Sequence, residues 1–215
     1  MDLKKYKNVH IIKHPLLDHK MTIIRKKETK TNDFRKVTKE IAMLLGFEAF
    51  RNLKTSKIKI KTPLEETIQP TIDGSKLCFV PILRAGLGMV EGFTDLIPGA
   101  KVGHIGLYRD PKTKKPVEYF IKLPKNIKNM EVYLIDPMFA TGGSAIDAVN
   151  CLKKRGVKKI SCICMVAAPE GVKAFCKVHK DVPVYIGALD RKLNSNKYIL
   201  PGLGDAGDRI FGTED

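Results

Sequence analysis

The chain has 215 residues and a mass of 24.0 kDa, and 43% of its residues are hydrophobic, which suffices for one domain with a sizeable core. No apolar run approaches the ~20 residues of a membrane-spanning helix, and residues 1–6 lack the apolar segment of a secretory signal. Five cysteines, an odd number without metal-ligand spacing, favour reduced thiols. We therefore expect a single-domain cytoplasmic protein over residues 1–215, with no membrane partner.

The formal net charge of +16 favours anionic ligands. Such a charge also occurs in nucleic-acid-binding proteins. The lysines are, however, spread through the whole chain, and no aromatic–basic interleaving of the kind used by RNA-binding strands is present. We interpret the charge as a lysine-rich surface that also favours a substrate with several phosphate groups, and we expect no nucleic-acid partner.

The first quarter of the chain predicts a short strand followed by two helices. Residues 8–12 are largely apolar and predict the strand, and residues 16–27 predict the first helix. Thr31 or Asn32 is predicted to cap the second, longer helix. Its core-facing positions recur at three- and four-residue spacing: Phe34, Val37, Ile41, Leu44 and Leu45.

A weaker strand signal follows. Lysine and isoleucine alternate strictly over residues 57–61, which predicts a half-exposed, peripheral strand. Residues 65–74 are predicted to form a loop or a short extended segment.

A buried strand over residues 77–83 leads to the first loop that suits a phosphate group. Arg84 comes directly after the strand, and the small residues at 85–88 open a helix. A guanidinium can bind two phosphate oxygens at once, which a lysine cannot reproduce. The alternative interpretation is a surface arginine at a strand end.

A further strand over residues 102–107 ends at Tyr108 and Arg109. Residues 110–116 are polar, basic and bounded by prolines, and apolar character returns at residues 117–120. A long loop in a compact domain is commonly a functional lid, so we predict a lid over about residues 109–119. An ordinary exposed hairpin is the alternative.

The central motif runs from Asp136 to Ser144 and reads Asp-Pro-Met-Phe-Ala-Thr-Gly-Gly-Ser. It lies between an apolar strand pattern at residues 132–135 and a helical pattern that ends at Gly156. Glycines let backbone N–H groups approach an oxyanion, hydroxyl groups add donors, and a helix N-terminus favours negative charge. Asp136 would repel a phosphate but suits the hydroxyls of a sugar. The motif therefore predicts a phosphorylated-sugar site, with an ordinary βα turn as the alternative.

The later elements indicate the fold class. Residues 159–167 predict a buried strand, residues 169–178 a helix, and residues 182–188 a last core strand that leads to Asp190. Alternation of strands and helices predicts an α/β fold with a mostly parallel central sheet covered by helices on both faces.

The C-terminal segment contains a misleading glycine pattern. Gly202, Gly204 and Gly207 match the dinucleotide-binding pattern G-x-G-x-x-G, but only eight residues follow Gly207. These are too few for the helix and second strand that a dinucleotide-binding unit requires. We interpret the segment as a rigid loop that presents backbone N–H and C=O groups.

Together these stretches resemble the type I phosphoribosyltransferase family. Residues 81–88, 136–144 and 198–212 are similar to its uracil phosphoribosyltransferase branch, and the resemblance covers nearly the entire chain. The resemblance implies the type I fold with a small hood built from the N- and C-terminal segments. It also implies transfer of the 5-phosphoribosyl group of 5-phosphoribosyl-1-diphosphate (PRPP) to N1 of uracil, which gives UMP and diphosphate. This chain departs from most relatives in having Asp136-Pro137 instead of two adjacent acids, and Phe139 where leucine is usual.

The resemblance also implies roles for individual residues, with the uracil-binding hood at about residues 190–212. The implied catalytic residues are Arg84, Arg109, Asp136 and Asp205. The implied PRPP-binding residues are Arg84, Arg109, Asp136, Pro137, Met138, Phe139, Ala140, Thr141, Gly142, Gly143, Ser144 and Asp205. The implied uracil-binding residues are Ile199, Gly204, Asp205 and Ala206, in a loop shaped by Pro201 and Gly202.

The same resemblance implies Mg²⁺ held mainly through PRPP, with no dedicated metal ligands in the protein. It further implies GTP as a candidate effector and a homodimer or larger homo-oligomer. Two other functions stay open. One is an RNA-binding regulator built on this fold, although such regulators lack the ending at residues 198–205. The other is a phosphoribosyltransferase for a different base, which would differ in the hood.

Overall fold

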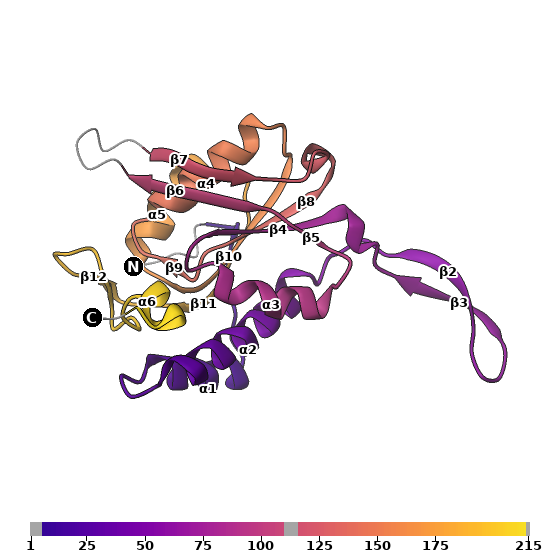
Figure 1. Ribbon diagram of the computed structural model, residues 1–215, viewed down its shortest axis with the longest axis horizontal. Helices are drawn as coiled ribbons and strands as arrows, with labels where there is room; N and C mark the ends of the chain where they lie inside the picture. Colours follow the sequence, from indigo (N-terminus) through magenta and orange to yellow (C-terminus); the bar gives the residue numbers. More distant parts are fainter. Residues whose placement is uncertain (1–5, 110–115, 214–215) are drawn as a thin grey trace.

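The computed structural model describes residues 6–109 and 116–213. Its centre is a sheet in which the strands follow the order β1-β11-β10-β8-β4-β6-β7 (Figure 1). All neighbours in this order are parallel except β6 and β7, and the short strands β5 and β9 pair with β4 and β10. The strands of this sheet are β1 (Val9–Ile11), β4 (Leu77–Leu83), β5 (Lys101–Val102), β6 (His104–Arg109), β7 (Pro116–Lys122), β8 (Glu131–Ile135), β9 (Met138–Phe139), β10 (Lys159–Ala167) and β11 (Val184–Leu189). The predicted mostly parallel sheet is confirmed.

Helices cover both faces of the sheet (Figure 1). One face packs against the four helices α1 (Pro15–Arg25), α2 (Thr31–Ala49), α3 (Leu87–Leu96) and α6 (Ala206–Phe211). The other face packs against α4 (Gly143–Lys154) and α5 (Pro169–Val178). The strands divide their side chains between the faces with the period of two that a strand requires: Phe79 and Tyr133 face the first layer, whereas Val80 and Val132 face the second.

All five cysteines are buried and unpaired. They belong to the core between the sheet and the α4–α5 layer. Burial raises the pKa of the Cys78 and Cys151 thiols to about 11, which keeps them protonated and unreactive at neutral pH. The prediction of reduced cysteines that act as small core residues is therefore confirmed.

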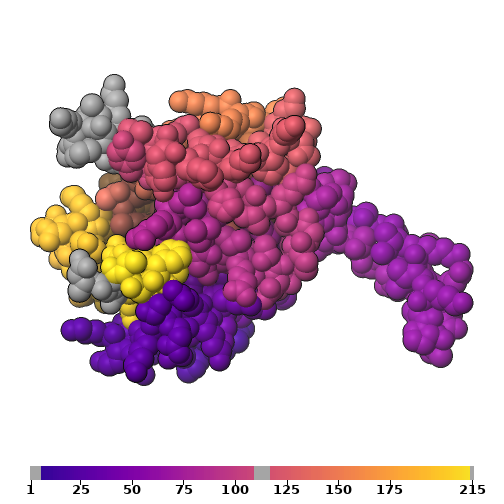
Figure 2. Space-filling view, in the orientation of Figure 1, coloured from indigo at the N-terminus to yellow at the C-terminus, as the bar shows by residue number. Residues whose placement is uncertain are grey.

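The β2–β3 hairpin (Ser56–Lys61 and Glu66–Thr71) extends away from the body of the molecule (Figures 1 and 2). The peripheral strand predicted over residues 57–61 is confirmed, but it is exposed on both faces and not half-exposed as expected. Ile58 and Ile60 are 44% and 37% exposed, because no other helix or strand of the described residues covers either face of the hairpin. The segment at residues 65–74, expected to be loop or extended, supplies the second strand.

Two local predictions were also wrong. The N-cap of α2 is Lys30, whose backbone is extended, whereas Thr31 and Asn32 are already helical and no side chain caps the helix. The strand expected over residues 102–107 is interrupted at Gly103, because the chain moves from pairing with the first half of β4 to pairing with its end.

Two short 3₁₀ helices, η1 (Gly74–Lys76) and η2 (Ile127–Asn129), precede β4 and β8, and a two-stranded sheet joins β12 (Lys192–Leu193) to β13 (Ile199–Leu200). Within the described parts of the chain, no helix is long and apolar enough to span a bilayer.

Candidate active site

The candidate site lies at the carboxyl edge of the parallel sheet. Strands β4 and β8 are neighbours, with Pro81 opposite Ile135, so the segments that follow them leave the sheet side by side. In open α/β sheets, ligands bind outside this edge. A cavity of about 390 Å³ at the opposite edge is lined by Leu77, Glu131 and Lys159, the first residues of their strands, and by none of the predicted site residues.

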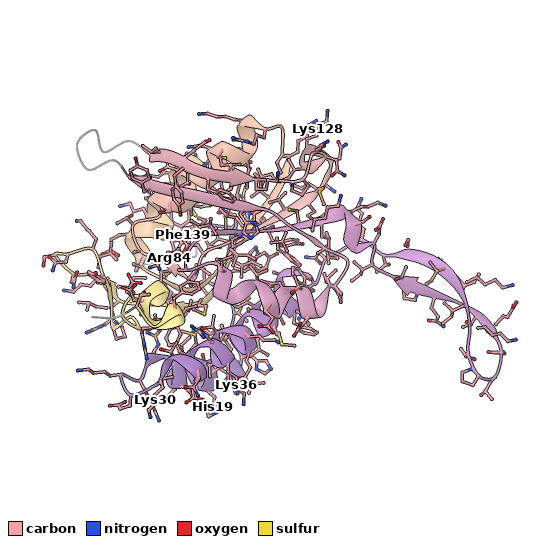
Figure 3. The ribbon with its side chains drawn as sticks, viewed as in Figure 1. His19, Lys30, Lys36, Arg84, Lys128 and Phe139 are labelled. Carbon is pink, nitrogen blue, oxygen red and sulfur yellow. The ribbon has the colours of Figure 1, made fainter. Side chains whose placement is uncertain are left out.

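The loop after β4 packs directly against the end of β8. A Cβ atom added to Gly86 would lie 2.6 Å from the carbonyl oxygen of Ile135, so only glycine permits this approach. The preceding Leu83–Arg84 peptide bond is cis. The Arg84 side chain is exposed and turns toward α6 (Figure 3), where its guanidinium lies 3.5 Å from the Asp208 carboxylate and 5.6 Å from the centre of the Phe211 ring. The loop thus presents a cation next to the C-terminal segment.

The segment from Asp136 to Ser144 is held in place by β10. The carbonyl of Pro137 accepts hydrogen bonds from the N–H groups of Met165 and Val166 at 3.2 and 3.1 Å, and the carbonyl of Phe139 accepts one from Ala168 at 3.0 Å. These bonds fix the path of the chain between β8 and the N-terminus of α4.

Gly142 turns the chain into α4. Its φ of +77° is in the left-handed region, and an added Cβ atom would lie 2.6 Å from the carbonyl oxygen of Gly171. Beyond this turn, the side chains of Thr141 and Ser144 are exposed beside the helix N-terminus. The first N–H groups of the helix and these two hydroxyls form the type of arrangement that binds a phosphate group.

The side chains of Pro137 and Phe139 point away from this surface. Both are buried, and the Phe139 ring packs edge-on against Phe175 at 5.2 Å between centroids, so the core accommodates phenylalanine here. Any contact of these two residues with a ligand would therefore be made by the backbone.

Asp136 is half-buried at the end of β8, and its carboxylate accepts one hydrogen bond from the described residues, from the Met138 N–H at 3.3 Å. Burial raises the pKa of its carboxyl group to about 7, and this hydrogen bond opposes the rise. No lysine or arginine of the described residues pairs with the Asp136 carboxylate. At neutral pH the carboxyl is therefore present in both its protonated and its ionised form. The ionised form can accept a hydrogen bond from a hydroxyl group or bind a cation.

The C-terminal loop connects β13 to α6. It passes through the cis Leu200–Pro201 bond and through Gly202 and Gly204, both with positive φ, and Asp205 then caps α6 by accepting a hydrogen bond from the Asp208 N–H at 3.0 Å. The rejection of a dinucleotide-binding unit is confirmed, because Gly207 lies within this six-residue helix and no strand follows it up to residue 213.

The four implied uracil-binding residues differ in accessibility. Gly204 and Asp205 are exposed, whereas the side chains of Ile199 and Ala206 are buried, so the latter two can offer only backbone atoms. In the part of the chain that the structure describes, no hydrogen bond uses the N–H or C=O of Gly204 or the N–H of Asp205. The loop therefore presents unused backbone donors and an acceptor on its open side.

Two predicted features are outside the described structure. Residues 110–115 of the predicted lid are not described, and for Arg109 only the backbone is, at the end of β6. The flanking strands β6 and β7 form an antiparallel hairpin, with Tyr108 and Tyr119 in contact at 6.2 Å between ring centroids.

A metal site made by protein side chains alone does not occur among the described residues, because no three His, Cys, Asp or Glu side chains cluster. Asp136 can supply one oxygen ligand. This suits Mg²⁺, which keeps several waters and is commonly bound by one or two carboxylates together with substrate phosphates.

Sequence reasoning missed the charged residues behind the C-terminal loop. Arg25, Asp190 and Arg209 are joined to this loop by hydrogen bonds, although Arg25 is far from it in sequence. The sequence placed Asp190 after the strand at residues 182–188, at the start of the hood at about residues 190–212, and gave it no role. No local pattern distinguishes these residues from surface charges.

Comparison with known structures first identifies the fold. The adenine phosphoribosyl transferase of Trypanosoma brucei, solved with AMP, pyrophosphate and ribose-5-phosphate, has a TM-score of 0.60 over 88% of this chain and 87% of that chain. At 12% identity this likeness concerns the fold alone. The fold is that of a type I phosphoribosyltransferase.

The particular family follows from more similar proteins. A solved structure of a protein from Aquifex aeolicus has a TM-score of 0.90 and 34% identity, covering 96% of this chain and 99% of that chain. The uracil phosphoribosyltransferase of Streptococcus salivarius is 55% identical over 204 residues, which are 95% of this chain and 98% of the relative. The model of the uracil phosphoribosyltransferase family matches residues 11–213. The chain belongs to the uracil phosphoribosyltransferase family, which confirms the resemblance inferred from its sequence.

Proposed function

We propose that the chain transfers the 5-phosphoribosyl group of PRPP to N1 of uracil, giving UMP and diphosphate. The observation that carries this proposal is the meeting of three segments at one edge of the sheet: the Arg84 loop, residues 136–144, and the loop that leads into α6. Arg84 lies 3.5 Å from Asp208 of α6, and a Cβ atom on Gly86 would lie 2.6 Å from the carbonyl oxygen of Ile135, directly before residues 136–144. One substrate can therefore contact all three segments.

In this proposal the N-terminus of α4 holds the 5′-phosphate. Gly142, Gly143 and the hydroxyls of Thr141 and Ser144 surround the position, and the helix dipole favours its negative charge. Met138 and Ala140 are half-buried beside them. Pro137 and Phe139 contribute through the backbone, because their side chains are buried.

The chemistry that we propose is electrostatic. The bond between C1 and the diphosphate breaks through an oxocarbenium-like state, while the guanidinium groups of Arg84 and Arg109 stabilise the departing diphosphate. Asp136 holds the ribose hydroxyls, and Asp205 lies beside PRPP. N1 of uracil then attacks from the opposite face, which inverts the anomeric centre. Positioning and preorganised dipoles supply most of the rate, and we assign no general base.

Uracil recognition is assigned to the loop that leads into α6, within a hood at about residues 190–212. Uracil presents the N3–H donor and the O2 and O4 acceptors along its edge, so it needs both acceptors and donors. The unused backbone groups of Gly204 and Asp205 provide both kinds, and Ile199 and Ala206 frame them. Residues 109–119 would form the lid that keeps water from the cationic intermediate.

Mg²⁺ is proposed to arrive with PRPP, to be bound to this chain through Asp136 at most, and to neutralise the diphosphate charge. GTP is proposed as an effector, which turnover measured with and without GTP would test.

We also propose a homodimer or larger homo-oligomer. The exposed apolar residues of the β2–β3 hairpin support self-association, since Leu64 and Ile68 are 95% and 64% exposed.

The test is product formation from PRPP and Mg²⁺ with uracil, cytosine, hypoxanthine or guanine offered separately. We expect UMP from uracil and no product from the other bases. Turnover of a purine would keep the PRPP site but contradict the assignment of the hood. A folded protein that binds PRPP and turns over none of the bases would contradict the enzymatic function and favour an RNA-binding regulator.

A further inference from the structure

A partly buried ion pair holds the C-terminal loop on the side of α1. Arg25, the last residue of α1, donates two hydrogen bonds to the Asp190 carboxylate, from Nη1 at 2.9 Å and from Nη2 at 2.6 Å. The same Nη1 donates to the carbonyl oxygen of Gly202 at 2.7 Å, and the Gly202 N–H donates to Asp190 at 2.8 Å. Both backbone groups of Gly202 are therefore fixed by one arginine–carboxylate pair.

A second arginine fixes the next residue. Nη1 of Arg209 donates to the carbonyl oxygens of Leu203 at 2.7 Å and Ile24 at 2.8 Å, and its Nη2 donates to Lys26 at 2.7 Å. Its guanidinium also lies over the Phe34 ring of α2, 4.4 Å from the centroid. Arg209 thereby binds carbonyl groups at the C-terminus of α1, where the helix dipole favours a positive charge.

Two of these three charged groups are almost completely removed from water. Asp190 and Arg209 are each 8% exposed, whereas the Arg25 side chain is 23% exposed. The bonds of the three residues to the loop go to the backbone of Gly202 and Leu203, both of which are buried. A buried ion pair is a weak source of stability but a specific constraint on geometry, because a displaced partner leaves an uncompensated charge. The networks therefore restrict where the loop can lie.

We propose that Arg25, Asp190 and Arg209 are positioning residues that set the place of the loop at residues 202–206, and hence the affinity for the base. They touch the loop through Gly202 and Leu203, directly before the unused backbone groups of Gly204 and Asp205. This inference rests on the proposed function. It gives α1 and α2 a role in base recognition, since α6 and its loop lie between these helices and the edge of the sheet (Figures 1 and 2).

Phosphate binding is anchored differently. The segment at residues 136–144 is tied to β10 through Pro137 and Phe139, and none of its hydrogen bonds involves Arg25, Asp190 or Arg209. A change at the arginines should therefore affect the base and the phosphoribosyl donor unequally. A larger effect on the affinity for the base than on that for the donor would distinguish a positioning role from a general loss of folding.

Arg25→Lys is the first variant to test. Lysine keeps the charge but cannot reach both Asp190 oxygens and the Gly202 carbonyl in the same geometry. We expect the KM for uracil to rise roughly 10-fold or more, because small displacements of binding groups have large effects. We expect the KM for PRPP to change several-fold less than the KM for uracil, because Asp205 is the residue of this loop that is also assigned to PRPP. We expect hydrogen exchange of the amides at residues 203–206 to accelerate while exchange at residues 142–146 does not.

Arg51→Lys is the matched control. Arg51 also donates two hydrogen bonds to one carboxylate, that of Glu48, at 3.1 and 2.7 Å, on the surface just after the end of α2. We expect it to leave both KM values and the exchange of the loop unchanged. If Arg25→Lys fails to fold, Asp190→Asn provides the same comparison, because it removes the charge and keeps the shape.

Equal changes in both KM values, or an unchanged uracil KM, would overturn the positioning role. If the unmodified protein makes no UMP, the proposed function fails, but hydrogen exchange still decides this inference: unchanged exchange at residues 203–206 in Arg25→Lys overturns it, and faster exchange confined to those residues supports it.

Discussion

Replacing Asp136 by asparagine should make the protein more stable and less active. The Asp136 carboxyl is half-buried at the end of β8 with one hydrogen bond, and burial raises its pKa from 3.8 to about 7. The unfolded chain releases this proton near pH 4, whereas the folded protein retains it up to about pH 7. The folded state therefore binds the extra proton between these values, and the free energy of unfolding falls as the pH rises through this window.

The size of the effect follows from the two pKa values. They differ by about three pH units, which corresponds to roughly 4 kcal/mol once the carboxyl is ionised in both states. An asparagine of the same shape does not ionise and avoids this penalty. At pH 8 the variant should gain roughly 2–4 kcal/mol relative to the unmodified protein, and at pH 4 the gain should fall below about 1 kcal/mol.

Urea unfolding at pH 4, 6 and 8 measures this difference directly. Asp181→Asn is the control with the opposite sign, because Lys153 at 2.8 Å holds the pKa of the Asp181 carboxyl below its usual value. That exposed pair should contribute less than about 1 kcal/mol, and this contribution is lost as the pH falls.

Steady-state kinetics should show a strong loss of turnover in Asp136→Asn, as expected for a functional group held in a destabilising place. A stability gain independent of pH would refute the reasoning on burial, and near-normal turnover would refute the role of Asp136.

Three further predictions concern other parts of the molecule. Arg84→Lys should lower kcat/KM for PRPP by about 10-fold or more without lowering the melting temperature, since lysine cannot bind two diphosphate oxygens together; unchanged kinetics would contradict the assignment. Gly142→Ala should cost about 2 kcal/mol or more in urea unfolding, because it combines a φ of +77° with a Cβ atom 2.6 Å from a carbonyl oxygen. Gly156 is the control, because it has a similar φ of +81° but an added Cβ atom would come no closer than 3.5 Å to another atom. Gly156→Ala should lower the free energy of unfolding by about half as much as Gly142→Ala. Equal losses in the two variants would show that the close contact at Gly142 contributes nothing. Ile68→Lys should shift the molecular mass measured by light scattering toward the monomer, and an unchanged mass would exclude this face of the hairpin from the assembly.

Local sequence patterns were sufficient to predict most strands and helices of the core. The strand at residues 77–83, the strand at residues 159–167 and the helix at residues 169–178 have the bounds that the sequence predicts. Each is an apolar run or an amphipathic pattern with a clear start or stop signal. The pattern at residues 57–61 was misjudged because alternation reveals a strand but does not reveal whether anything packs against it.

The gathering of the phosphate loops could also be expected, because parallel strands place their carboxyl ends at one edge. The direction in which each side chain points could not be predicted from the sequence. Phe139 and Ile199 look like neighbours of a ligand in the sequence, yet their side chains belong to the core. The pKa of Asp136 depends on its burial, and the contact of Arg25 with Asp190 joins residues 165 positions apart. Both depend on the complete tertiary structure, for which a short motif contains no information.

The position of β1 has a consequence for how the chain is made. This strand, formed by residues 9–11, pairs with β11, so Val9 meets Val184 only after 175 further residues have been synthesised. At typical rates of synthesis this takes roughly 10–35 s. During this interval β1 has no partner strand, and the apolar faces of α1 and α2 lack the C-terminal helix that later covers part of them. Such long-range pairing is slow and exposes surfaces that aggregate. The apolar surfaces of residues 9–49 therefore stay incompletely covered until residues 184–211 have been synthesised.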